Sequence, residues 1–254
     1  MAEKIDAIKE ELTATPTEAL EAFVEKYASD SRTGVQKLVD TAKKRVDKLQ
    51  KEMIRTEKFK ENMKKSTIHI TYICGIDEVG RGPLAGPVVA GAVILPKDCD
   101  ILYINDSKKL SAAKREELYD IIMEQAVATG LGTIGPDRID EINILQATYE
   151  AMRQAIAQLS PQPDLLLNDA VTIPKVAIPQ VPIIKGDAKS ISIGAASIIA
   201  KVTRDRMMVY YDSIYPEYGF ASNKGYGSAE HIAALKKYGP TPIHRRTFIK
   251  NFVS

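Results

Sequence analysis

Four acidic residues stand where β-strands of this chain are expected to end. Asp77 and Glu78 follow one apolar stretch, and Asp169 and Asp187 follow two others. Ligand sites of α/β sheets lie at the carboxyl ends of strands. Carboxylates held close together repel one another unless cations lie between them, and oxygen donors without nearby His or Cys suit Mg²⁺ or Mn²⁺. We therefore expect a two-metal site of the kind that supports phosphodiester hydrolysis.

The four acids have a structural alternative. A single Asp at a strand end is more often a turn cap, although that alternative weakens when all four are taken together. Adjacent residues of a regular strand point to opposite faces, so Asp77 and Glu78 converge only if the ladder is distorted there. Gly80 and Gly82 supply a backbone able to do this. The spacing therefore predicts an acid cluster beside a distorted strand end.

Other chemistries have weaker support. No Gly-x-Ser-x-Gly motif is present, so a serine nucleophile of that kind is not expected. The stretch Gly80–Gly86 is rich in glycine but lacks the Lys-Ser/Thr of a P-loop. Two cysteines, Cys74 and Cys99, form neither a disulfide framework nor a four-ligand zinc site, even with the three histidines. They favour a reducing compartment.

Hydrophobic periodicity indicates the elements that position the acids. Strands are predicted over residues 68–77, 87–95, 131–134, 164–169 and 181–185. Helices are predicted over 111–126, with Ser111 as N-cap, over 136–159, and from 190 onward. The small residues at 194–197 allow this last helix to approach a sheet closely. We expect the first two strands to form a central hairpin of a mixed five-stranded α/β sheet flanked by helices.

Residues 1–66 differ from residues 67–254 and are predicted to form a separate helical extension. Residues 1–31 carry three basic and eight acidic groups, whereas residues 32–65 carry twelve basic and five acidic groups. One helix is expected to begin at Thr15 and to run to Tyr27. A second carries one apolar stripe, formed by Val35, Val39, Ala42, Val46, Leu49 and Met53. Packing within the extension is the favoured role of the stripe; phosphate contact by its lysines and a coiled coil are the alternatives.

The overall composition is that of an ordinary globular protein. Of 254 residues, 44% are hydrophobic and 27% charged, and the formal net charge is +2, so any polyanion must be met by a local patch. The longest apolar stretch, Pro83–Pro96, is too short and too broken by Gly and Pro to span a bilayer, and the first residues are too acidic for a signal peptide. We expect a cytoplasmic monomer with no membrane partner.

Four motifs resemble those of bacterial ribonuclease HII, in the family's order over residues 71–248. They are GIDEVGRGPLAGPV at 75–88, NDSKKL at 105–110, GDAKS at 186–190 running into AASIIAKVTRD at 195–205, and KGYG at 224–227. The resemblance implies an RNase H-like catalytic domain that cleaves RNA in RNA/DNA hybrids and at single ribonucleotides embedded in duplex DNA. It also implies that Asp77, Glu78, Asp169 and Asp187 are the metal-binding catalytic acids, and that the products carry 3′-hydroxyl and 5′-phosphate ends.

Substrate selectivity requires further residues. Gly80, Arg81 and Gly82 expose backbone groups that can approach a ribose, whose 2′-hydroxyl distinguishes RNA from DNA. Tyr226 is similar to the family tyrosine that stacks on the sugar beside the ribonucleotide; the alternative for a Gly-Tyr-Gly loop is a turn with a half-buried ring. Phosphate contacts are predicted for three residues, with solvation as the alternative for the lysines: Ser107, Lys108 and Lys189. We interpret Lys201, Arg204 and Arg206 as helix surface charge.

Two other functions remain as alternatives. The related HIII type needs several consecutive ribonucleotides, and the Gly-Arg-Gly and Gly-Tyr-Gly elements argue against it, as does a helical rather than sheet-like N-terminal segment. A catalytically inactive hybrid-binding module would lack at least one of the four carboxylates, and none is missing.

Overall fold

The computed structural model describes residues 3–15, 19–44, 46–47, 71–97, 99, 101, 103–104, 107 and 110–253. Its contacts divide the chain into two compact units, residues 1–64 and 65–254. The boundary predicted between residues 66 and 67 lies outside the described residues.

The first unit is helical. Helices α1 (Ile5–Ala14) and α2 (Leu20–Tyr27) are followed by helical residues 33–44. They share one core, made of Ile8, Leu12, Leu20, Phe23, Tyr27, Val35, Val39 and Ala42. Three members of the predicted stripe are therefore buried within the unit, Val46 packs against them, and Leu49 and Met53 lie outside the described residues. For the described part of the stripe, the packing role is confirmed.

The predicted start of α2 is wrong. The Thr15 hydroxyl donates to the carbonyl of Glu11 at 2.7 Å, so Thr15 completes the end of α1. Helix α2 begins at Leu20, after Ala19, which makes no side-chain capping bond. Residues 16–18 lie outside the described part of the chain. The predicted end of α2 at Tyr27 is confirmed.

The second unit is built on a five-stranded sheet with the order β3-β2-β1-β4-β5. Strands β1 to β3 are antiparallel neighbours, and β4 and β5 continue parallel to β1. The strand bounds are β1 (Ile73–Val79), β2 (Val88–Ile94), β3 (Ala128–Ile134), β4 (Leu165–Asp169) and β5 (Gln180–Ile183). This mixed sheet, with its central hairpin, confirms the predicted fold class.

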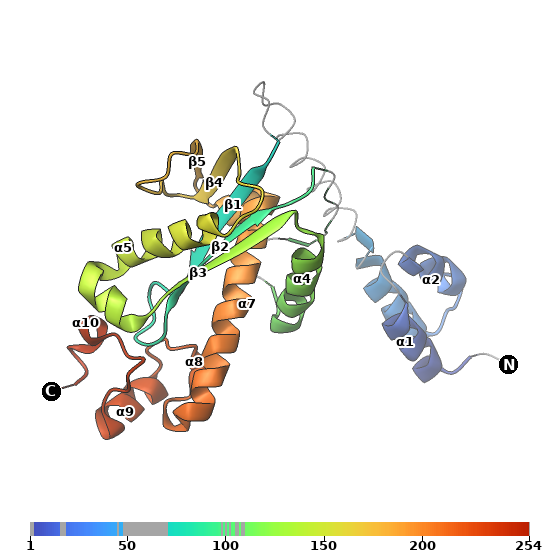
Figure 1. Ribbon diagram of the computed structural model, residues 1–254. Coiled ribbons are helices and arrows are strands. Elements are labelled where there is room, and N and C mark those ends of the chain that lie inside the picture. The colour runs from blue at the N-terminus through green and yellow to red at the C-terminus, as the bar shows by residue number, and fades with distance from the viewer. Residues whose placement is uncertain are drawn as a thin grey trace. The chain divides into compact units, whose positions relative to one another are not determined.

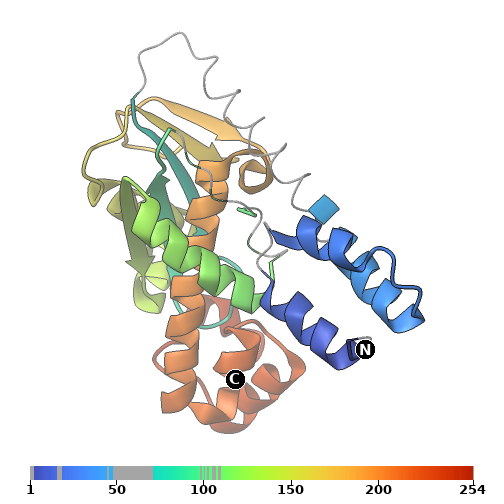
Figure 2. The ribbon, with the colours of Figure 1, turned by 90° about the vertical axis from the view of Figure 1, so that its right-hand side faces the viewer.

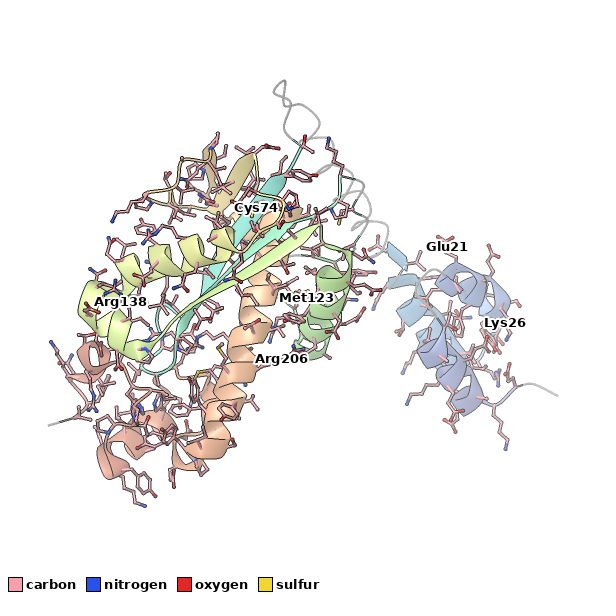
Figure 3. The ribbon with its side chains drawn as sticks, in the orientation of Figure 1. Glu21, Lys26, Cys74, Met123, Arg138 and Arg206 are labelled. Atoms are coloured by element: carbon pink, nitrogen blue, oxygen red, sulfur yellow. The ribbon has the colours of Figure 1, made fainter. Side chains whose placement is uncertain are left out.

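Helices cover both faces of the sheet (Figure 1). Helix α5 (Pro136–Ala157) packs on β2 and β3, and α7 (Ile191–Ile214) packs on β1 and β2, with α4 (Ala112–Gln125) beside it. The predicted cap at Ser111 is confirmed, because its side chain accepts from the N–H of Lys114 at 3.2 Å. Cys74, in β1, lies at 0% exposure in the core shared with α5 (Figure 3).

Helix α5 approaches β3 closely at glycines. A Cβ at Gly132 would lie 1.8 Å from the carbonyl oxygen of Ala151, and one at Gly135 would meet nothing within 4 Å. We expect Gly132→Ala to lower the free energy of unfolding by about 3 kcal/mol, because backbone must move to admit the methyl group. Gly135→Ala is the control, and we expect it to lower the free energy of unfolding by no more than about 1 kcal/mol. Urea denaturation measures both, and equal effects would contradict this packing.

Several further helices gather at the end of α7 beside the connection between β1 and β2 (Figures 1 and 2). They are the short helix η3 (Pro216–Tyr218), α8 (Phe220–Asn223), α9 (Ala229–Tyr238) and α10 (Arg246–Ile249). Their core includes Ala85 of the connection and Met208 of α7. Within the described part of the chain, no helix is both long and apolar enough to cross a membrane.

Candidate active site

Two of the predicted acids lie side by side at the carboxyl ends of neighbouring strands. The parallel register pairs Ile76 of β1 with Asn168 of β4, so the next residues, Asp77 and Asp169, share one face of the sheet. On β2, Asp77 pairs with Gly91, whose missing side chain lets α7 approach that same face. The pair therefore lies at the edge of the surface that α7 covers.

The predicted distortion of β1 is absent. The ladder with β2 runs unbroken from Cys74 to Val79 and pairs Glu78 with Ala90. Consecutive residues of such a ladder point to opposite faces, so Glu78 does not share the face of Asp77. Its carboxylate instead forms an ion pair with Arg81 at 3.3 Å. The Glu78 side chain is nevertheless close enough to Asp77 to act on it electrostatically.

Asp77 occupies an unusual environment for a carboxylate. Its side chain is only 7% exposed, and burial together with the neighbouring Glu78 and Asp169 carboxylates raises its pKa well above the usual value. The N–H of Glu78 donates to its Oδ1 at 2.8 Å, and Ser197 of α7 also donates to it. Ser197 is in turn hydrogen-bonded to Ser107 at 2.9 Å. A compensating cation would favour the charged form of Asp77.

Asp187 reaches the same end of the sheet through a short helix, α6 (Gly186–Lys189). The N–H of Gly186 donates to Oδ1 of Asp169 at 2.8 Å, which fixes the start of α6 beside β4. Asp187 is half-buried, whereas Lys189, at the end of α6, is exposed. Ser107 is 3% exposed, and Lys108 lies outside the described residues. The roles predicted for these residues stay predictions.

The donor chemistry of this site fits Mg²⁺ or Mn²⁺. Within the described ranges, no three His, Cys, Asp or Glu side chains are gathered closely enough to hold a metal by themselves. Mg²⁺ commonly binds through one or two carboxylates, with waters and substrate phosphates completing its shell. Asp77 and Asp169 offer two such carboxylates, and the burial of Asp77 beside negative charge gives a cation a favourable place.

The glycine-rich connection after β1 is held by two buried arginines. Arg245 donates to the carbonyls of Gly80, Arg81 and Gly86 at 2.5, 2.9 and 3.0 Å. Arg204 of α7 donates to Pro87 at 2.8 Å and to further carbonyls, those of Ala85 and Lys224. Both guanidinium groups are 0% exposed, and burial lowers the pKa of Arg204 to about 10 and that of Arg245 to about 9. Both remain cations at neutral pH.

This arrangement determines where the connection presents its amide groups. In a trans peptide the N–H points away from the preceding C=O. Because the carbonyls of Gly80 and Arg81 point to Arg245, the N–H groups of Arg81 and Gly82 point away from it. No backbone acceptor among the described residues binds either N–H. The connection therefore offers two adjacent donors on the side away from the buried guanidinium.

Tyr226 lies next to these donors. A Cβ at Gly82 would be 3.7 Å from Cε1 of the tyrosine ring, which is 49% exposed. The carbonyl of Gly225 accepts from the N–H groups of Leu84 and Ala85 at 2.8 and 3.3 Å. The structure thus brings the Gly-Arg-Gly and Gly-Tyr-Gly elements together, although about 140 residues separate them in the sequence.

The interpretation of Arg204 as surface charge is wrong. Residues Ala196, Ala200 and Met208 of α7 are buried at intervals of four, and Arg204 continues this stripe. That periodicity is the signal that could have identified it. Arg245 follows no such pattern. Arg206, on the same helix, has a half-exposed side chain, is paired with Glu116 of α4 at 2.5 Å, and fits the surface interpretation (Figure 3).

Comparison with known proteins gives the family. A model described as Ribonuclease HII matches residues 74–251, and one described as Ribonuclease HII N-terminal domain matches residues 4–62. The chain belongs to the ribonuclease HII family. It is therefore a ribonuclease H, an endonuclease that hydrolyses phosphodiesters. A ribonuclease HII of Lachnoclostridium phytofermentans is 63% identical over 251 residues, covering 99% of this chain and 98% of the relative. One of Clostridioides difficile is 52% identical and covers 97% of each chain.

Solved structures of ribonucleases H share the fold. The crystal structure of ribonuclease H2 from Pyrococcus horikoshii matches with a TM-score of 0.61 and 30% identity, over 71% of this chain and 96% of that one. Bst-RNase HIII in complex with Mn²⁺ matches with a TM-score of 0.53 and 16% identity, over 65% and 61% of the two chains, which shows the fold alone. The RNase H-like fold implied by the ribonuclease HII motifs is confirmed.

Proposed function

We propose that this ribonuclease HII family member hydrolyses the RNA strand of RNA/DNA hybrids and incises duplex DNA on the 5′ side of single embedded ribonucleotides. The products would carry 3′-hydroxyl and 5′-phosphate ends. The observation that carries the proposal is the position of the Tyr226 ring beside Gly82, at the end of the strand that holds Asp77. A ring for the sugar and two backbone donors then follow, along the chain, the strand that carries one of the two carboxylates.

Each part has a distinct task in this proposal. The donors at Arg81 and Gly82 bind the 2′-hydroxyl, which is both donor and acceptor and is absent from DNA. The Tyr226 ring stacks on the neighbouring sugar. Arg204 and Arg245 fix the backbone that carries the donors, so that little ordering is needed when substrate binds.

The acids would hold a pair of divalent cations. Asp77 and Asp169 would be the central ligands, with Glu78 and Asp187 completing the set, as the family motifs imply. When bound, such ions activate water and stabilise the charge that develops on the leaving 3′-oxygen. The solved structure of Bst-RNase HIII, which shares the fold, is described as a complex with Mn²⁺, and this supports a divalent cation as the cofactor. Ser197 orients the Asp77 carboxylate.

A substrate series tests the proposal. The full chain is incubated with three duplexes, carrying one ribonucleotide, four consecutive ribonucleotides, or none, in Mg²⁺, Mn²⁺ or EDTA. We expect metal-dependent incision 5′ of the single ribonucleotide and none in the all-DNA duplex. Cleavage restricted to the four-ribonucleotide duplex would contradict the proposal and favour the HIII type. Binding without cleavage of any duplex would indicate the inactive module.

A further inference from the structure

Two histidines form a buried pair beneath the Tyr226 loop. His231 lies in α9, His244 lies in the segment before α10, and their Nε2 atoms are 3.0 Å apart. The two side chains are 0% and 1% exposed. The rings of Tyr218 and Phe220 pack around them, with centroids 5.1 to 6.2 Å away. The proposed catalytic steps use neither histidine.

The partners of the pair decide where its protons lie. The backbone N–H of Thr241 can only donate, and it lies 2.9 Å from Nδ1 of His244. Neutral His244 therefore carries its proton on Nε2 and donates to Nε2 of His231. His231 then carries its proton on Nδ1 and donates to the carbonyl of Tyr226 at 2.8 Å. The bonds run in one direction, from Thr241 to Tyr226.

This direction requires both rings to be neutral, because a second Nε2 proton would point at the first. Burial and the neighbouring His231 lower the pKa of His244 to about 4, and burial lowers the pKa of His231. Arg246 is the charged group that acts on His244, and it also lowers that pKa. At neutral pH the pair is uncharged and its bond directions are fixed.

Each end of the pair is attached to one of the two substrate elements. Ala85 and His244 form an isolated β-bridge. In it the backbone N–H of Gly86 donates to the carbonyl of Ile243 at 2.8 Å, and the backbone N–H of Arg245 donates to the carbonyl of Leu84 at 2.9 Å. At the other end, the Tyr226 carbonyl accepts from Nδ1 of His231. The histidines therefore connect the backbone of the glycine-rich connection with the backbone of the tyrosine.

We propose that His231, oriented by His244, is a positioning residue that holds Tyr226 at its distance from Gly82 and so sets the preference for single ribonucleotides. The inference rests on the proposed function of Tyr226. The tyrosine ring is half exposed, so its own packing does not fix it. Its backbone must supply the placement, and misplacement of a contacting group by about 1 Å can cost up to a hundredfold in rate.

Two substitutions at His231 separate positioning from simple stability. In His231→Asn the side-chain amide nitrogen takes the place of Nδ1. It keeps the hydrogen bond to the Tyr226 carbonyl, and the hydrogen bond to His244 is lost. In His231→Gln the terminal amide takes the place of Nε2. It keeps the hydrogen bond to His244, and the hydrogen bond to the Tyr226 carbonyl is lost. Each variant gives up one buried hydrogen bond, so we expect similar losses of thermal stability. Only the second variant removes the side-chain bond to the Tyr226 carbonyl, which still accepts from the N–H of Ser228 at 2.8 Å.

The readout is the ratio of kcat/KM on the single-ribonucleotide duplex to kcat/KM on the four-ribonucleotide duplex, using the full chain in Mg²⁺. We expect His231→Gln to lower this ratio about tenfold and His231→Asn to keep it near the wild-type value. Leu235→Ala, a core change one helical turn from His231 that removes neither hydrogen bond of the pair, should lower stability and leave the ratio unchanged.

Three results would overturn the inference. They are an unchanged ratio in His231→Gln, an equal fall in both His231 variants, and a matching fall in Leu235→Ala. A failure of the proposed function is distinguishable, because it would appear in the wild-type chain as an inability to incise at a single ribonucleotide.

Discussion

Asp77→Asn is expected to lower the rate of phosphodiester cleavage by about a thousandfold or more, with the affinity for hybrid changed only a few-fold. The substitution keeps the shape of the side chain and removes its negative charge. That charge lies in a buried position beside Asp169, where its attraction to a bound cation is strongest. Contacts along the substrate backbone involve other residues, so binding should persist. Single-turnover cleavage and equilibrium binding in Ca²⁺ measure the two effects separately.

The same variant should fold normally. Burial disfavours the charged form of Asp77, so a neutral amide at this position should make the metal-free chain at least as stable as the wild type. The stabilisation that Mn²⁺ gives the wild type should shrink or vanish in the variant. Thermal melts with EDTA and with Mn²⁺ measure both effects.

Asp164→Asn is the matched control for charge. Asp164 precedes β4, at the opposite end from Asp169, and its carboxylate accepts from the N–H groups of Thr71 and Tyr72 at 2.9 Å. We expect wild-type cleavage from this variant. Retained turnover in Asp77→Asn, or loss of hybrid binding with full turnover per bound complex, would contradict the role given to Asp77.

Tyr226→Ala is expected to lower kcat/KM on the single-ribonucleotide duplex by about tenfold to a hundredfold, and to change cleavage of long hybrids far less. Stacking on an aromatic ring contributes about 1–3 kcal/mol, and this ring lies beside Gly82. A long hybrid offers other positions for productive binding, whereas a single ribonucleotide has one. The ring is half exposed, so its loss should not disturb folding.

Tyr226→Phe separates the ring from the hydroxyl. It keeps the stacking surface, and we expect most of the single-ribonucleotide activity to remain. An equal loss on both substrates in Tyr226→Ala would show that the ring supports cleavage in general rather than recognition of the junction. Steady-state kinetics on the two duplexes, with melting temperatures for each variant, decide between these outcomes.

The regular elements could be predicted because their signals are local. The apolar run of β2, the Ser111 cap of α4 and the small residues at the start of α7 each depend on neighbours along the chain, and each prediction is confirmed. The predicted start of α2 was wrong because a hydroxyl such as that of Thr15 can bond to the helix that precedes the residue as well as cap the helix that follows. Local pattern does not choose between those two uses.

Family membership and the candidate acids also followed from the sequence alone, because the types and order of the motif residues carry them. The placement of those acids did not. The side chain of Asp77 shares a face of the sheet with that of Asp169 and not with that of Glu78. The pairing of β1 with β2 and β4 decides which face each of these residues points to. Only the tertiary structure showed which groups Arg204 binds and that Arg245 and the histidine pair are buried, because their partners are backbone carbonyls and a ring nitrogen from distant segments. Such bonds depend on which loops meet in space, and no period in the sequence records that.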